Sequence, residues 1–151
     1  MANTQSMCTS FKGELLVGHH NFGTGVVRAA TTADTFKAAL YLVSATVNAS
    51  TTAYSSTGEV TGTGYTAGGV TVTFGTVPAT SGTTAFVTPS ASISYSAVTL
   101  STAFDAVLIY NSTQSNKAVS VHTFGSQTVT AGTFTLTMPT NDASTGLIRL
   151  A

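Results

Sequence analysis

Acid–base catalysis in this chain would depend on a small number of ionisable side chains. The 151 residues include five acidic residues, five basic residues and three histidines. The carboxylates are those of Glu14, Asp34, Glu59, Asp105 and Asp142. No two of them are close in the sequence, so a catalytic carboxylate pair would have to be assembled from distant strands. Because five acids serve the whole surface, we expect no such pair and predict that the chain is not an enzyme.

A metal site or a nucleophilic pair would depend on His19, His20, His122 and Cys8. Neighbouring side chains point to opposite faces of a strand and diverge by about 100° on a helix, so His19 and His20 are poorly placed to share one ion. Cys8 has no CxxC partner and would have to reach His122 to form a thiolate–imidazole pair. We therefore predict no catalytic residue, no metal and no cofactor, and expect structural or interface roles for the histidines.

The glycine-rich segment 61–69, TGTGYTAGG, is the remaining candidate for ligand binding. It lacks the Lys-Ser/Thr ending of a phosphate-binding loop and does not open a helix, so nucleotide binding is not expected. Four glycines in nine residues predict a loop with tight or left-handed backbone that makes contacts. Sugar binding stays a minor alternative, because the chain has no tryptophan and its tyrosines mostly fit core or strand-pair positions.

The composition limits the classes of partner. Only 7% of the residues are charged and the formal net charge is zero, whereas about 25% charged residues is usual for a soluble domain. We therefore expect no nucleic-acid-binding and no polybasic membrane-binding surface. The polar surface must come largely from 31 threonines and 17 serines, and weak charge repulsion favours self-association. No run suits a membrane span or a secretory signal, so we expect no membrane partner and synthesis in a cytoplasm.

The stretch from Val60 to Ala103 contains no charged residue. Exposed edge strands are commonly protected from pairing with other chains by lysines or inward-pointing charges. Two interpretations stay open. Either bulges, loops and prolines such as Pro78 and Pro89 cover the edges, or other protein chains do.

Alternating apolar and polar residues, interrupted by Gly, Pro, Asn or Ser clusters, predict an all-β fold, an antiparallel β-sandwich of jelly-roll-like or Ig-like type. Strands are expected at 35–44, 69–74, 85–88, 92–100, 106–110, 118–124, 132–138 and 147–150. Segment 106–110, AVLIY, is continuously apolar and is expected in the middle of a sheet. The predicted organisation is an N-terminal arm, residues 1–22, followed by one β-sandwich domain, residues 23–151.

The N-terminal arm is expected to carry one short helix at 11–18, with Ser10 as its cap. A helix of two turns is marginal alone, so its apolar stripe must pack against something. Either the stripe closes one end of its own sandwich, or it docks on another chain with polar residues such as Lys12, Glu14, His19 and His20 around it. The candidate interface residues, including three of the glycine-rich loop, are Phe11, Lys12, Leu15, Leu16, His19, His20, Phe22, Gly64, Tyr65 and Gly68.

Several segments together point to a known group of proteins. They are FKGELLVGHHNF from Phe11, TFKAALYL from Thr35, TTAYSSTGEVTGTGYTAGG from Thr51, AVLIYNST from Ala106, NKAVSVHTFG from Asn116, GTFTLTMP from Gly132 and LIRLA from Leu147. In this order they cover most of the chain. The sequence resembles small virion structural proteins of tailed bacteriophages, and is most like capsid decoration (cement) proteins built on a β-sandwich.

The resemblance implies a non-enzymatic protein that stabilises the capsid shell by binding at capsomer junctions. The implied partners are the major capsid protein and further copies of the chain itself, with a trimer as the expected oligomer. The implied location is the capsid exterior, after synthesis in the cytoplasm of the bacterial host. An alternative that the resemblance leaves open is a tail or head-fibre component that binds a glycan or the host surface.

Overall fold

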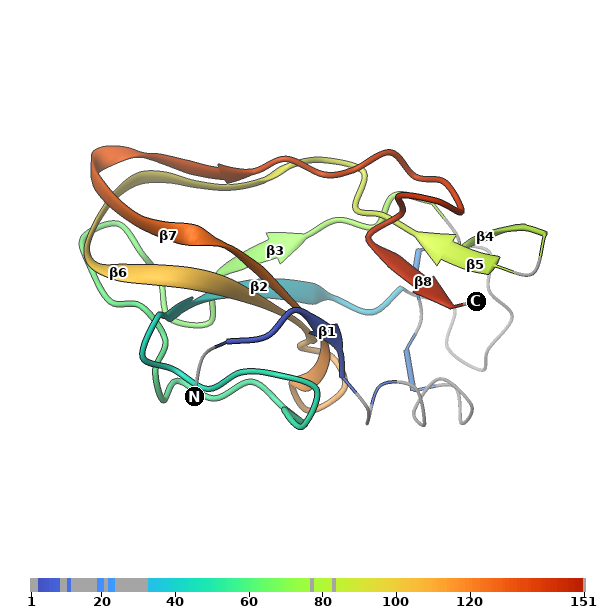
Figure 1. Cartoon of the computed structure of the whole chain (residues 1–151), viewed down its shortest axis with the longest axis horizontal. Coiled ribbons are helices and arrows are strands. Elements are labelled where there is room, and N and C mark those ends of the chain that lie inside the picture. The colour runs from blue at the N-terminus through green and yellow to red at the C-terminus, as the bar shows by residue number, and fades with distance from the viewer. Residues whose placement is uncertain are drawn as a thin grey trace.

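The described residues form β-strands arranged in two antiparallel sheets, which confirms the predicted all-β sandwich class (Figure 1). The structure is a computed structural model, and it describes residues 3–8, 11, 19–20, 22–23, 33–76, 78–82 and 84–150. The strands are β1 (Ser6–Met7), β2 (Phe36–Leu42), β3 (Val70–Val72), β4 (Ala79–Ser81), β5 (Thr84–Val87), β6 (Ile93–Asn111), β7 (Lys117–Leu136) and β8 (Ile148–Leu150). The larger sheet has the order β1-β7-β6-β2-β3, and the smaller sheet has the order β4-β5-β8.

The long β6–β7 hairpin is the main element of the fold. The sequence predicted two strands in each arm of this hairpin, separated near residues 101–105 and 125–131, and the structure joins each pair into one strand. The small and polar residues at these places do not end the strands. Instead, the pairing register shifts at several points between Tyr95 and Ala106. Such bulges bend a strand without ending it. A segment whose sequence pattern predicts two strands and a turn can therefore form one bent strand.

The bend brings the open end of the hairpin back over the rest of the larger sheet, as Figure 1 shows for the upper parts of β6 and β7. Tyr95, near the start of β6, donates a hydrogen bond from its hydroxyl to the carbonyl oxygen of Ala38 in β2 at 2.8 Å. The open end of the hairpin therefore packs over β2, although β6 and β7 both belong to the larger sheet.

The hydrophobic core runs along the central strands. The prediction that segment 106–110 lies in the middle of a sheet is confirmed, since β6 lies between β7 and β2 and these five residues are buried. Phe11 and Phe22 join Phe36 and Phe74 at one end of the core, where the Phe22 and Phe36 rings stack 4.8 Å apart.

The shorter strands follow the sequence pattern less closely. β2, β3, β5 and β8 lie within or next to predicted strands, whereas β1 and β4 were not predicted. β4 has the sequence Ala-Thr-Ser and all its residues are exposed, so it carries no apolar alternation that could reveal it. The predicted helix lies outside the described residues except for Phe11, and the division into an arm and a domain stays a prediction.

Candidate functional site

Glu59 is the only charged residue that is buried among the described residues, with 6% of its surface exposed. Its Oε1 accepts hydrogen bonds from the Tyr65 hydroxyl and the Gly68 backbone N–H, each at 2.7 Å. Its Oε2 accepts a hydrogen bond from the Tyr54 hydroxyl at 2.7 Å. All three donors are uncharged, so this carboxylate is held by dipoles, and its burial depends on all three bonds.

All five tyrosines of the chain gather around Glu59. The Tyr110 ring stacks on Tyr54 with centroids 4.7 Å apart, and its hydroxyl donates to the Gly68 carbonyl at 2.8 Å. Tyr95 stacks on Tyr65 at 5.9 Å, and the Tyr41 hydroxyl donates to the Ser55 carbonyl. Sequence reasoning placed the tyrosines in the core but did not connect them with Glu59.

The tyrosine hydroxyls remain protonated at neutral pH. Burial is the main reason that the pKa of Tyr41 is raised to about 12, and the nearby Glu59 carboxylate raises it further. The same two causes raise the pKa of Tyr65 and Tyr95. The phenols therefore act as hydrogen-bond donors in this cluster, and the arrangement favours a structural role over proton transfer.

The glycine-rich loop packs on its own chain. A Cβ on Gly62 would lie 2.1 Å from the Thr99 carbonyl oxygen, and one on Gly64 would lie 2.2 Å from that of Ala97. The Thr99 N–H donates to the Thr63 carbonyl at 2.9 Å. Close approach of two backbones explains these glycines. The contacts that the structure gives this loop are therefore internal.

The interface candidates of the loop differ in exposure. Gly64 is exposed, Tyr65 is half-buried and Gly68 is buried. Tyr65 and Gly68 both contribute hydrogen bonds to the Glu59 cluster. Their interface role stays a prediction.

The described candidates of the N-terminal arm lie against the core. Phe11 and Phe22 are buried, as expected if the arm closes one end of its own sandwich. His20 is buried with its ring centroid 4.7 Å from that of Phe11, and its Nδ1 lies 3.2 Å from Nδ2 of Asn111. His19 is half-buried, and no other described residue forms a hydrogen bond with its Nδ1. Lys12, Leu15 and Leu16 lie outside the described residues.

The groups considered for metal or thiol chemistry are dispersed. The part of the chain that the structure describes contains no group of three or more His, Cys, Asp or Glu side chains that could hold a metal ion. Cys8 is buried, and its Sγ lies 3.9 Å from the Asn48 carbonyl oxygen. Within the same residues, no helix is long and apolar enough to cross a membrane.

Ser120 and His122 form the arrangement nearest to a nucleophile and its base. Ser120 Oγ lies 2.9 Å from His122 Nε2, and the two residues share one face of β7 because they are two positions apart. The spacing of two residues on a predicted strand was the sequence signal that could have indicated this Ser–His pair. A Ser–His–acid mechanism also requires a carboxylate that orients the imidazole, and among the described residues no carboxylate is hydrogen-bonded to His122.

The pH dependence of stability should reveal His122. Burial lowers its pKa from 6.5 to about 4, so the unfolded chain binds this proton more readily than the folded chain. The free energy of unfolding should therefore fall by about 2–3 kcal/mol as the pH drops from about 6.5 to about 4. Urea unfolding across this range measures the loss. In His122→Phe this part of the pH dependence of the free energy of unfolding should be absent. An equally large fall in the variant would contradict its attribution to His122.

Comparisons with known proteins identify no relative. No protein-family model, no curated protein and no solved structure matches the chain. The fold and the site must therefore be interpreted from the residues themselves. Their main features are a buried carboxylate held by uncharged donors, a glycine-rich loop packed on its own chain and a charge-poor surface.

Proposed function

We propose that this chain is a non-enzymatic structural protein of a bacteriophage virion. It decorates the capsid exterior at capsomer junctions and stabilises the shell, with the major capsid protein as its partner. The sequence resemblance suggests this role, and the structural observation that supports it is an outward sheet face without charged side chains.

The open end of the β6–β7 hairpin carries this face. Ser94 and Ser96 of β6 and Thr133 and Thr135 of β7 are exposed, and we call these four residues the hydroxyl face. Ser94 Oγ and Thr135 Oγ1 lie 3.1 Å apart, which places the two strands' hydroxyls on the same side. The segments 60–103 and 118–141, which include the open ends of both strands, contain no charged residue.

A face of this kind suits burial against another protein. Burying a charged side chain without a partner is costly, whereas a hydroxyl can both donate and accept a hydrogen bond across an interface. Many weak contacts of this type, repeated over a shell, stabilise the assembled shell because the decorating protein binds the assembled shell and not its separate subunits. The same face offers no exposed tyrosine on which a sugar ring could stack, since all five tyrosines are buried or half-buried. This disfavours the glycan-binding alternative.

Capsid binding tests this function. The purified chain should co-sediment with capsids of its source phage that lack it. Thr133→Lys/Thr135→Lys should weaken binding by at least about tenfold, because two ammonium groups would have to be desolvated at the contact. The control is Ser50→Lys/Ser56→Lys, which adds the same charge to exposed positions of the loop between β2 and β3. Circular dichroism should show that both variants keep the β fold.

The outcomes separate the two virion roles. Equal binding by both lysine variants would contradict the hydroxyl face as the contact. If the chain binds no capsid and electron microscopy places it in the tail or a head fibre, the decoration role is overturned in favour of the alternative. The trimer that the resemblance implies is tested in two ways. Light scattering measures the oligomeric state of the free protein, and electron microscopy gives its copy number at each capsid site.

A further inference from the structure

A cavity of about 120 Å³ lies where the open end of the β6–β7 hairpin folds back over the larger sheet. Ile93 and Leu136, which pair at the open end, meet Val107 and His122, which pair in the other half of the hairpin. The complete lining is Ile93, Val107, Ile109, His122, Thr123, Phe124, Leu136, Thr137, Met138 and Leu147. Ile93, Val107 and Ile109 are buried, whereas Thr137 is exposed. The cavity therefore has an apolar floor and a side that reaches the surface.

His122 gives this apolar wall a strong hydrogen-bonding group. Its Nε2 lies 2.9 Å from Ser120 Oγ, and among the described residues no group is hydrogen-bonded to Nδ1. Burial lowers the pKa of this imidazole to about 4, so the ring is neutral at neutral pH. A neutral imidazole has one donor and one acceptor nitrogen. None of the lining residues is an Asp, Glu, Lys or Arg, so the cavity offers a charged ligand no ion-pair partner.

We propose that this cavity binds a small uncharged ring that carries one hydroxyl group, such as a phenol. An apolar cavity of roughly 150 Å³ accommodates benzene, so a slightly smaller cavity with one open side has the size for a six-membered ring. The aliphatic and aromatic lining would cover the ring, and the imidazole would pair with the hydroxyl. An entirely apolar cavity would disfavour a phenol, because its hydroxyl would lose its bonds to water without replacement.

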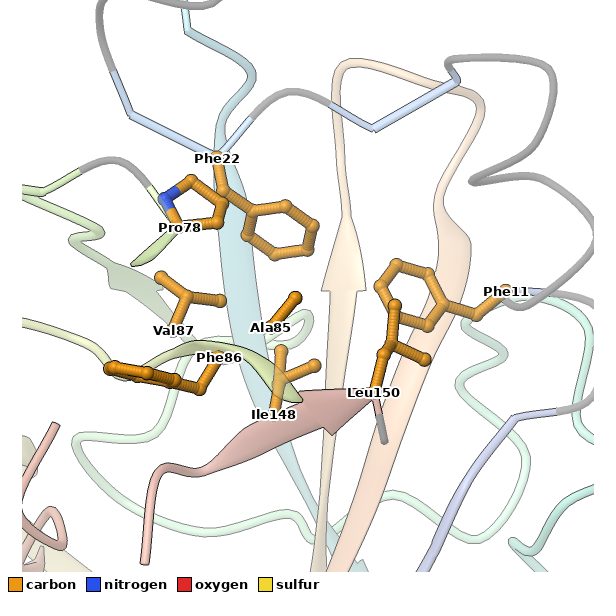
Figure 2. A pocket seen from close by; sticks show the side chains of 8 residues that line it. All are labelled: Phe11, Phe22, Pro78, Ala85, Phe86, Val87, Ile148 and Leu150. Carbon is orange, nitrogen blue, oxygen red and sulfur yellow. The ribbon is translucent and has the colours of Figure 1, made fainter. Parts of the chain in front are cut away.

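A second apolar pocket, near the smaller sheet, has no hydrogen-bonding side chain comparable to His122. Figure 2 shows it lined by Phe11, Phe22, Pro78, Ala85, Phe86, Val87, Ile148 and Leu150, and its volume is about 110 Å³. None of these side chains has a hydrogen-bonding group. The two cavities have similar volumes, so comparing them separates the effect of size from that of the imidazole.

Benzene and phenol are the probes that test the site. We expect phenol to shift the amide NMR signals of His122, Thr123 and Leu136 of the isotope-labelled protein and to bind at least as tightly as benzene. Ser120→Ala/His122→Phe keeps an aromatic ring in the wall and removes the imidazole together with the hydroxyl bonded to it, while the Thr123 and Thr137 side chains of the lining stay in place. In this variant benzene should bind as before, and the affinity for phenol should fall about tenfold. Leu136→Phe, which adds bulk at the half-buried wall, should abolish binding of both probes.

Several results would overturn the proposal. One is the absence of saturable shifts in the unaltered protein, and another is benzene binding without phenol binding. Phenol affinity unchanged by Ser120→Ala/His122→Phe, or binding unchanged by Leu136→Phe, would show that the probes bind elsewhere or do not use the imidazole. If a variant does not fold, the two affinities of the unaltered protein still test the proposal, and weaker binding of phenol than of benzene would overturn it. Shifts confined to Phe86 and Ile148 would assign binding to the pocket in Figure 2 and equally reject the proposal.

Discussion

Gly69→Ala is expected to prevent folding or to lower the free energy of unfolding by more than about 4 kcal/mol. A Cβ at this position would lie 1.6 Å from the carbonyl oxygen of Ala38 and 2.8 Å from Cα of Ala39. Both contacts are with backbone, so no side-chain rotation relieves them. Gly69 also has φ +71°, which a residue with a Cβ adopts at a cost.

The backbone of β2 has little room to move away from such a Cβ. Ala38 pairs with Val70 of β3 on one side and with Ile109 of β6 on the other. A shift of Ala38 would therefore disturb two ladders and the Tyr95 hydrogen bond to its carbonyl oxygen. This is why the expected loss exceeds the usual cost of a glycine substitution in a loop.

Two other glycines separate the steric effect from the backbone effect. Gly82 has φ +58°, and a Cβ there would have no atom of the described residues within 4 Å beyond its own chain neighbours, so Gly82→Ala should cost only about 1–2 kcal/mol. Gly125 has equally open space and no positive φ, so Gly125→Ala should be neutral or stabilise by about 0.4–1 kcal/mol. Urea unfolding measures all three. A folded Gly69→Ala with a loss close to that of Gly82→Ala would contradict the steric explanation.

The parts of the fold that were predictable are those whose pattern is local. The continuously apolar run 106–110 identified a central strand, and the alternation in 69–74 identified β3, because burial on two faces or on one face leaves its own periodicity. The bends of β6 and β7 were not predictable in this way. Residues 101–105 and 125–131 resemble turns locally, and only the pairing between the two strands makes them bulges.

The Glu59 cluster was hidden for a related reason. Glu59 was considered only as half of a carboxylate pair, although Tyr54 and Tyr65 flank it closely in the sequence. Tyr110 enters the cluster through a bond to Gly68 that spans 42 residues, and Tyr95 through a bond to Ala38 that spans 57 residues. Contacts between residues so far apart in the sequence are determined by the topology, and the spacing of residues in the sequence does not predict them.

Glu59→Ala should lower the free energy of unfolding by about 4 kcal/mol, a large share of the ~5–15 kcal/mol that holds a typical domain. The substitution removes the acceptor of the Tyr54 hydroxyl, the Tyr65 hydroxyl and the Gly68 N–H. The Gly68 N–H is buried and the two hydroxyls are partly buried, and a buried donor left without an acceptor costs about 1–3 kcal/mol. Urea unfolding gives the total, and faster hydrogen exchange at the Gly68 amide would report release of the glycine-rich loop.

Glu59→Gln distinguishes hydrogen bonding from charge. Its carbonyl oxygen can replace Oε1 as acceptor for Tyr65 and Gly68, while its NH₂ group can donate to the Tyr54 oxygen if that hydroxyl turns away. We therefore expect a loss of only about 1 kcal/mol. Asp105→Ala is the control for removing an acid, since Asp105 is half-buried and accepts a bond from Asn3 Nδ2. If Glu59→Ala cost no more than Asp105→Ala, the buried carboxylate would not be what fixes the loop to the strands beneath it.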